Sequence, residues 1–152
     1  MGSDYEEYEK ECAAIREING VHLSGFEKWL ENSGLAAKTI CKHVSNAEFY
    51  INDFLCYYDA QDARHGCYCA GSFLGDWFIR KAMWASCSGI KSYAASFEKF
   101  YAYLLSVGVI EQKDLDYLCY DTKASLPDWL AEMRRHDDWV DGLIDDEDYF
   151  SA

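Results

Sequence analysis

Apolar side chains recur at helical spacing along two long stretches of this chain. The first stripe repeats every three or four residues and consists of Ile40, Val44, Ala47, Ile51, Phe54 and Tyr58. The second repeats in the same way and consists of Ile90, Ala94, Phe97, Tyr101 and Leu104. Because an α-helix has about 3.6 residues per turn, such intervals put the apolar residues on one face. The pattern therefore predicts two long amphipathic helices, over 37–58 and from the Ser86–Gly89 turn to Gly108.

Shorter helices are expected before the first of these stripes. Tyr5, Tyr8, Cys12 and Ile15 have helical spacing and predict a first helix over 5–18, which Asn19-Gly20 would end. Ser24-Gly25-Phe26-Glu27 has the form of a capping box, with serine at the N-cap and glutamate three residues later. It predicts a second short helix that Asn32-Ser33-Gly34 ends, since glycine readily adopts the left-handed conformation found after a helix.

The remaining segments also predict helices, separated by a loop over 60–71. One helix is expected from a Ser72 cap to about Trp84, one from an Asp114 cap, and one opened by Ser125 and Pro127 and ended by Arg134-Arg135-His136. The larger aromatic residues lie at or near core spacing and are expected inside: Trp29, Trp77, Trp84, Trp129, Phe97 and Phe100. No stretch predicts a long strand. The fold class is therefore all-α, a compact orthogonal bundle of about five to six helices.

Composition supports a folded core and an intracellular setting. Half of the 152 residues are hydrophobic, which is too much apolar mass for a disordered chain. The seven cysteines are odd in number and follow an acidic start with no secretory pattern, so we expect reduced thiols in a cytoplasmic protein. No apolar run approaches the length of a membrane span, and no membrane partner is expected.

Charge divides the chain into three parts. Residues 1–17 carry a net charge of −4, residues 137–152 carry −7, and the span 18–136 between them carries only −2. We therefore expect an acidic, helical N-terminal segment over 1–20, a helical domain over 21–136 and an acidic tail over 137–152. The acidic ends either keep the chain soluble or compete with a polyanion for a basic face.

The residues offer little for catalysis or metal binding. His65-Gly66-Cys67-Tyr68-Cys69, with Cys56 upstream, is the one metal-like cluster. Zinc sites usually have two to four residues between paired ligands, whereas this pair is Cys-x-Cys and no second pair follows it. No nucleophile elbow, phosphate-binding loop, dinucleotide fingerprint or His-Glu-x-x-His occurs. We expect no enzyme activity, no metal and no cofactor.

The basic and hydroxyl residues of the two long helices are the candidate binding residues. Short hydroxyl side chains and lysines near helix N-termini are the groups that contact DNA phosphates. On the first long helix the candidates are Lys38, Thr39, Lys42 and His43, and on the second they are Ser88, Lys91, Ser92, Ser96 and Lys99.

Two segments resemble the core-binding domain of tyrosine recombinases, the SAM-like N-terminal domain of phage integrases. The first is Phe26…Trp29-Leu30 followed by Gly34-Leu35…Lys38-Thr39-Ile40, and the second is the helix 91–104 followed by Val107-Gly108-Val109-Ile110. The resemblance covers about residues 22–120 and implies a helical bundle that clamps double-stranded DNA with its two long helices. Applied to this chain, it implies that the nine candidates above contact DNA.

The family's catalytic domain is not matched, because no histidine here has arginine three positions later. The resemblance therefore implies a non-catalytic DNA-binding module related to DNA integration and recombination. The alternative is a protein-interaction or regulatory module that kept the fold and lost DNA binding, with acidic ends that contact a recombinase or another basic protein. The sequence indicates neither a target site nor an oligomeric state.

Overall fold

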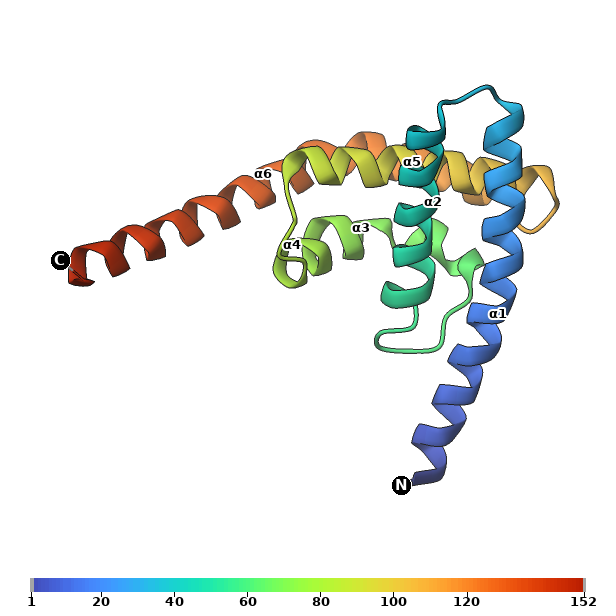
Figure 1. The fold of residues 1–152 in the computed structure, drawn as a ribbon, viewed down its shortest axis with the longest axis horizontal. Helices are drawn as coiled ribbons and strands as arrows, with labels where there is room; N and C mark the ends of the chain where they lie inside the picture. Colours follow the sequence, from blue (N-terminus) through green and yellow to red (C-terminus); the bar gives the residue numbers. More distant parts are fainter. Residues whose placement is uncertain (1, 152) are drawn as a thin grey trace.

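The computed structural model is all-α, as the sequence predicts (Figure 1). It describes the backbone of residues 2–151 and the side chains of residues 3–142, and no strand occurs among these residues. The helices are α1 (Gly2–Asn32), α2 (Ala37–Glu48), η1 (Phe49–Phe54), η2 (Ala63–Tyr68), α3 (Ala70–Ser72), η3 (Phe73–Trp77), α4 (Phe78–Lys81), α5 (Cys87–Ser106) and α6 (Gln112–Ser151). No helix in the described part of the chain has the length and apolar character needed to cross a membrane.

The first two predicted helices are one continuous helix, α1. Asn19 does not end a helix but is buried, and its amide donates to the Ile51 carbonyl at 3.3 Å and to the Asn52 side chain at 2.9 Å. Gly25 does not follow an N-cap. Instead it lets the Tyr103 side chain approach α1 closely, because a Cβ at this position would lie 1.8 Å from the Tyr103 hydroxyl. Tertiary contacts thus override two local helix-breaking patterns. The end at Gly34 is confirmed, with a φ of +79°.

The two long stripes form the structural centre. α2 continues directly into the π-helical turn η1, so the predicted helix over 37–58 exists to residue 54, whereas Tyr58 is exposed. α5 crosses α2 steeply in Figure 1, and the ring centroids of Tyr50 and Phe97 lie 4.1 Å apart at the crossing. Ser86 caps α5 by accepting from the Gly89 amide at 2.9 Å. The helix ends before Gly108, whose φ is +78°, as expected.

The middle of the chain is more broken than the pattern predicts. The expected loop contains the short 3₁₀ helix η2, which Asp62 caps by accepting from the Arg64 amide at 3.0 Å. Ser72 makes no capping hydrogen bond, and the helical run from Ala70 ends at Lys81. The predicted core position of Trp84 is therefore wrong: the residue lies beyond this helix, and its side chain is 60% exposed.

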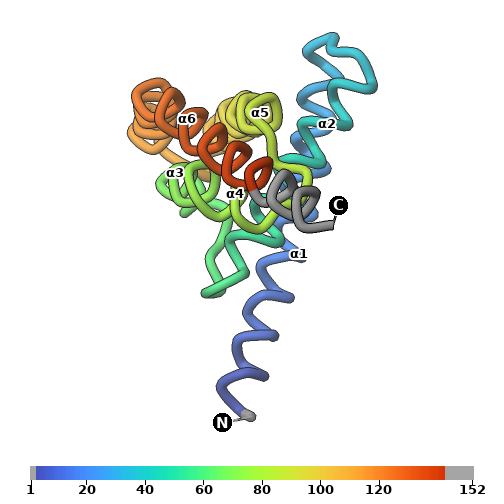
Figure 2. The backbone as a smooth tube through the Cα atoms, turned by 90° about the vertical axis from the view of Figure 1, so that its left-hand side faces the viewer, coloured from blue at the N-terminus to red at the C-terminus, as the bar shows by residue number. Residues whose placement is uncertain are grey.

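The last two predicted helices are also one helix, α6, which lies beside α5 in both Figure 1 and Figure 2. Asp114 still stabilises the start of α6, because its carboxylate accepts a hydrogen bond from the Glu111 amide at 2.9 Å. Pro127 lies inside the helix and does not end it, because Trp129 and Met133 beyond it are buried in the core. The expected boundaries at 20/21 and 136/137 fall within α1 and α6. Of the acidic tail, the side chains of 143–152 lie outside the described residues.

Candidate nucleic-acid interface

A buried polar network joins α2 to α5 where the two helices cross. Nδ1 of His43 lies 2.7 Å from the Ser96 hydroxyl, and the Asn46 amide donates to the hydroxyls of Ser96 at 3.0 Å and Ser92 at 3.1 Å. Ser96 also donates to the Ser92 carbonyl at 3.0 Å. Ser96 is completely buried and His43 nearly so. The network fixes the register of the crossing, because each of these polar groups would be costly to bury without its partner.

This network corrects the sequence interpretation of three candidates. His43 and Ser96 bond each other and are buried, so neither offers an exposed side chain to a phosphate, and half-buried Ser92 already accepts from Asn46. Burial lowers the pKa of His43, and the nearby Lys99 ammonium lowers it further. His43 is therefore a neutral structural residue near pH 7.

The other six candidates are exposed on the two helices. They are Lys38, Thr39 and Lys42 on α2, and Ser88, Lys91 and Lys99 on α5. None of the four lysines takes part in an ion pair with the side chains that the structure describes. We call these four lysines the lysine face. Two of these lysines project from α2 and two from α5, and the two helices are in contact. Lysines on neighbouring helices can contact successive phosphates of a DNA backbone.

The structure brings part of the lysine face together directly. Lys38 and Lys42 are four residues apart and share one side of α2. Lys99 of α5 lies close enough to His43 of α2 to lower the pKa of that histidine. Lys91 is eight residues before Lys99, about 12 Å along α5. The lysine face therefore spans the crossing from α2 onto the exposed side of α5.

The side of α2 that faces α1 has a different character. There α2 meets α1 across a groove of about 440 Å³, and Ile40 and Val44 form part of its apolar wall. Glu27 and Glu31 of α1 contribute carboxylates to this groove. Cys41 and Ser45 also line this groove, and they follow Lys38 by three and seven residues on α2, so Lys38 borders the side that holds these acids.

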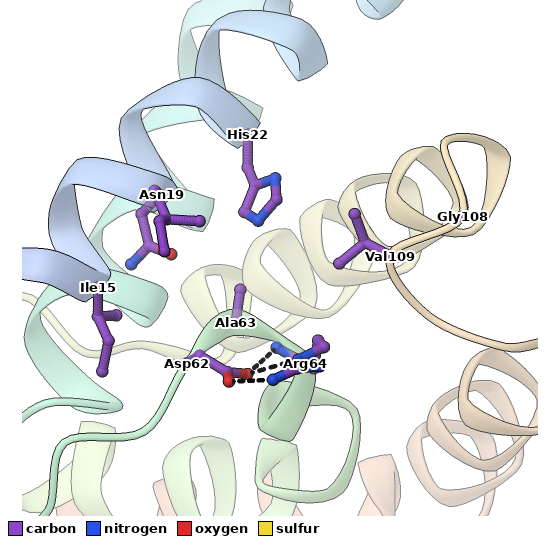
Figure 3. Close-up of a pocket in the computed structure, with 9 residues that line it drawn as sticks. Ile15, Asn19, His22, Asp62, Ala63, Arg64, Gly108 and Val109 are labelled. Carbon is purple, nitrogen blue, oxygen red and sulfur yellow. Dashed lines mark hydrogen bonds and ion pairs between the residues drawn. The ribbon is translucent and has the colours of Figure 1, made fainter.

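A second hollow, of about 340 Å³, lies between α1, the start of η2 and the turn after α5 (Figure 3). Asp62 forms an ion pair with Arg64 at 2.7 Å, and the Arg64 hydrogen bond holds the pKa of Asp62 below its usual value. His22 faces the same hollow, and burial lowers its pKa. Because the Asp62 carboxylate is already paired with the Arg64 guanidinium, this hollow would bind an anion only weakly.

The cysteine cluster of the sequence does not assemble into a set of ligands. Cys67 is buried, which raises the pKa of its thiol to about 12, and the Cys69 thiol lies 3.8 Å from the Gln61 side-chain oxygen. Among the described residues, no three His, Cys, Asp or Glu side chains lie together as a metal-binding group.

Sequence reasoning missed the turn between α4 and α5. The Ala85 amide donates to the Ala82 carbonyl at 3.1 Å and closes a tight turn with Met83 and Trp84 at its tip. Met83 is 100% exposed and Trp84 is 60% exposed. The periodicity gave no sign of this, because Trp84 follows an apolar helix without an intervening glycine or proline. In comparisons with protein-family models, curated proteins and solved structures, nothing matched this chain.

Proposed function

We propose that this chain is a non-catalytic module that binds double-stranded DNA through the lysine face of α2 and α5, in the context of DNA integration or recombination. The observation that carries the proposal is the state of four lysines. In a chain with 27 acidic and 14 basic residues, Lys38, Lys42, Lys91 and Lys99 are exposed and make no ion pair with a described side chain. The resemblance of residues 22–120 to a recombinase core-binding domain points to the same two helices.

The position of the acidic N-terminal segment supports this proposal. In Figure 1 the start of α1 and the start of α2 lie at opposite ends of the molecule. Glu9 precedes the end of α1 by 23 residues, which is roughly 35 Å along the helix axis. Glu9 and the acids before it therefore lie far from Lys38 along α1.

The salt dependence of binding to a labelled duplex, measured by fluorescence anisotropy, tests the proposal. If four lysines each displace one condensed counterion, their contacts make the logarithm of the association constant fall against the logarithm of salt concentration with a slope no steeper than about −3.6. Replacing Lys42 or Lys99 by glutamine should make this slope less steep by about 0.9. Lys10→Gln is the matched control, because Lys10 is an exposed lysine near the start of α1. Absence of binding to any duplex at tens of micromolar protein and low salt would reject the proposal.

One observation favours a second function, interaction with a basic protein. α6 continues past Met133, the last buried residue among its described side chains, and carries exposed Asp137, Asp138 and Asp141 on a regular helix. An acidic rod of this kind could occupy the DNA groove of a recombinase. The test is competition: the full chain should displace a labelled duplex from a tyrosine recombinase, and a chain ending at His136 should not. Equal displacement by both chains would exclude this role for the tail.

A further inference from the structure

We infer that this chain forms a two-fold dimer in which Met83 of each copy inserts into an aromatic hollow of the other copy. The inference goes beyond the proposed function, because the dimer requires no DNA. It rests on three features of one surface: an exposed knob, a hollow that accommodates it, and exposed aromatic area beside both. A two-fold axis brings the same patch of two copies together, so a knob and a hollow on one patch are both filled twice.

The knob is Met83, at the tip of the turn between α4 and α5. Its side chain is fully exposed, whereas Ala82 before it is buried and donates its amide to the Phe78 carbonyl at 3.0 Å. After the turn, Ser86 caps α5. The exposure of the knob is therefore imposed by fixed flanking structure. A tip held in this way needs no rearrangement of the backbone when it enters a partner, which lowers the cost of binding.

The aromatic hollow lies where η1 meets η3. Its volume is about 300 Å³, and Phe54, Tyr58 and Trp77 contribute rings to its lining. This space is large enough for a methionine side chain. Methionine is flexible and polarizable, and its sulfur makes favourable contacts with aromatic rings. The hollow is therefore chemically matched to the knob.

A row of aromatic rings connects the knob to the aromatic hollow. The Trp84 ring meets the Phe49 ring edge-on with centroids 5.6 Å apart, and the Phe49 ring lies 6.0 Å from that of Trp77 in the hollow. The Tyr57 ring lies 5.4 Å from the Trp77 ring, and the Lys81 ammonium lies 5.8 Å from the Tyr57 centroid. The knob and the hollow are therefore neighbours on one surface.

The exposed area of this surface identifies a second copy as its occupant. Tyr57 and Tyr58 are 48% and 64% exposed, and Trp84 and Met83 are 60% and 100% exposed. If a large side chain presents about 200 Å² when fully exposed, these four leave about 500 Å² open to solvent. Two copies that cover each other's patch bury about 1,000 Å², which is the area that a specific interface needs. Tyrosine and tryptophan are also the residues that dominate the binding energy of protein interfaces.

The charges on this surface complement one another. Lys81 lies two residues before the knob, and Asp59 lines the aromatic hollow. Neither forms an ion pair with a side chain that the structure describes, whereas Asp76, the second acid of the hollow, is paired with Arg80 at 2.7 Å. Asp137 lies beside the knob as well, so neither sign of charge dominates. When the knob enters the hollow of the other copy, Lys81 approaches Asp59 of that copy, and the two-fold axis repeats the pair.

Sedimentation equilibrium of the full chain without DNA tests the inference. The chain should be monomeric at low micromolar concentration and dimeric at several hundred micromolar, as expected for an interface of this small size. Met83→Ser and Tyr58→Ser should each weaken dimerisation at least tenfold, because each removes the contact from both ends of the dimer. Tyr120→Ser is the matched control, since Tyr120 is 75% exposed but lies on α6, and it should leave dimerisation unchanged.

A mixture of the two variants tests the reciprocal insertion itself. Met83→Ser keeps an intact hollow and Tyr58→Ser keeps an intact knob, so their heterodimer retains one complete contact, whereas neither homodimer retains any. The mixture should therefore associate more strongly than either variant alone. A chain that stays monomeric at several hundred micromolar overturns the inference, and so does a dimer that neither variant weakens or a mixture no stronger than its components. A monomer that binds a duplex or lipid vesicles through the turn, with binding lost in Met83→Ser, overturns it too.

Discussion

Two glycines that the sequence marks as helix ends should respond in opposite ways to alanine. Gly20 lies inside the continuous helix α1, has no positive φ, and a Cβ there meets nothing within 4 Å. Gly34 also has open space around it, but its φ is +79°. The two positions therefore differ in backbone conformation and not in crowding, which makes the pair a clean test of the continuity of α1.

The expected magnitudes follow from these conformations. Alanine is favoured over glycine in a helix interior by about 1 kcal/mol, so Gly20→Ala should raise the free energy of unfolding by about that amount. A side chain in the left-handed region costs about 1–2 kcal/mol, so Gly34→Ala should lower it. The two variants should therefore differ by about 2–3 kcal/mol in stability.

Urea unfolding followed by far-ultraviolet circular dichroism measures both values. A control is Gly25→Ala, also inside α1, where the new Cβ would lie 1.8 Å from the Tyr103 hydroxyl. It should gain less stability than Gly20→Ala or lose stability, since the crowding costs about 1–3 kcal/mol. If Gly20→Ala destabilises the protein as much as Gly34→Ala does, the chain breaks at Asn19-Gly20 and the continuous α1 is wrong.

Three further predictions concern stability and reactivity. Tyr101→Phe should cost about 1–3 kcal/mol in thermal unfolding, because the buried hydroxyl donates to the Ala63 carbonyl at 2.7 Å, whereas the same change at exposed Tyr120 should have little effect. As pH falls below about 6.5, the unfolded chain protonates its histidines before buried His43 does, so stability should fall. His43→Gln should be less stable at pH 7 but should reduce that slope by up to about 1.4 kcal/mol per pH unit, measured by urea unfolding. Cys41 is the one exposed thiol among the seven and should react first with Ellman's reagent under native conditions, and a faster reaction of a buried thiol would contradict this packing.

Helical periodicity predicted the two central helices because both bury one face against the same core. Apolar spacing gave the span of α2 with η1 and of α5, and glycine chemistry gave the turns at Gly34 and Gly108. The continuity of α1 and α6 could not be predicted in this way. Asn19 is held by bonds to residues more than thirty positions away, and Pro127 is retained in a helix by core contacts on its far side. Local propensity cannot represent such long-range contacts.

The candidate interface was predictable in part for a similar reason. The lysines are exposed because they lie opposite the apolar stripes, so sequence alone placed them correctly. The buried position of His43 also left a trace in the sequence, since it follows Ile40 by three residues and precedes Ala47 by four, which is the spacing of the core. Ser96 likewise follows buried Tyr93 by three residues and precedes buried Phe100 by four. The pairing of these two polar groups needed the crossing of α2 and α5, which no single-helix pattern encodes.

The net charge of −13 does not by itself decide whether this chain binds DNA. Electrostatic screening limits the reach of an exposed charge to about 8 Å at physiological ionic strength and about 30 Å at 0.01 M salt. Along α1, Glu9 lies roughly 35 Å and Glu17 roughly 22 Å from the end of the helix, which leads into α2. At physiological salt a phosphate at the lysine face therefore experiences the local lysines much more strongly than these acids. At very low salt these acids also act on the duplex and oppose part of the attraction by the lysines. As salt rises, screening weakens both the repulsion between the N-terminal acids and the duplex and the attraction between the lysines and the duplex. The acidic end consequently makes the observed salt slope less steep than four lysines alone would give, and neutralising Glu9 and its neighbours should steepen it.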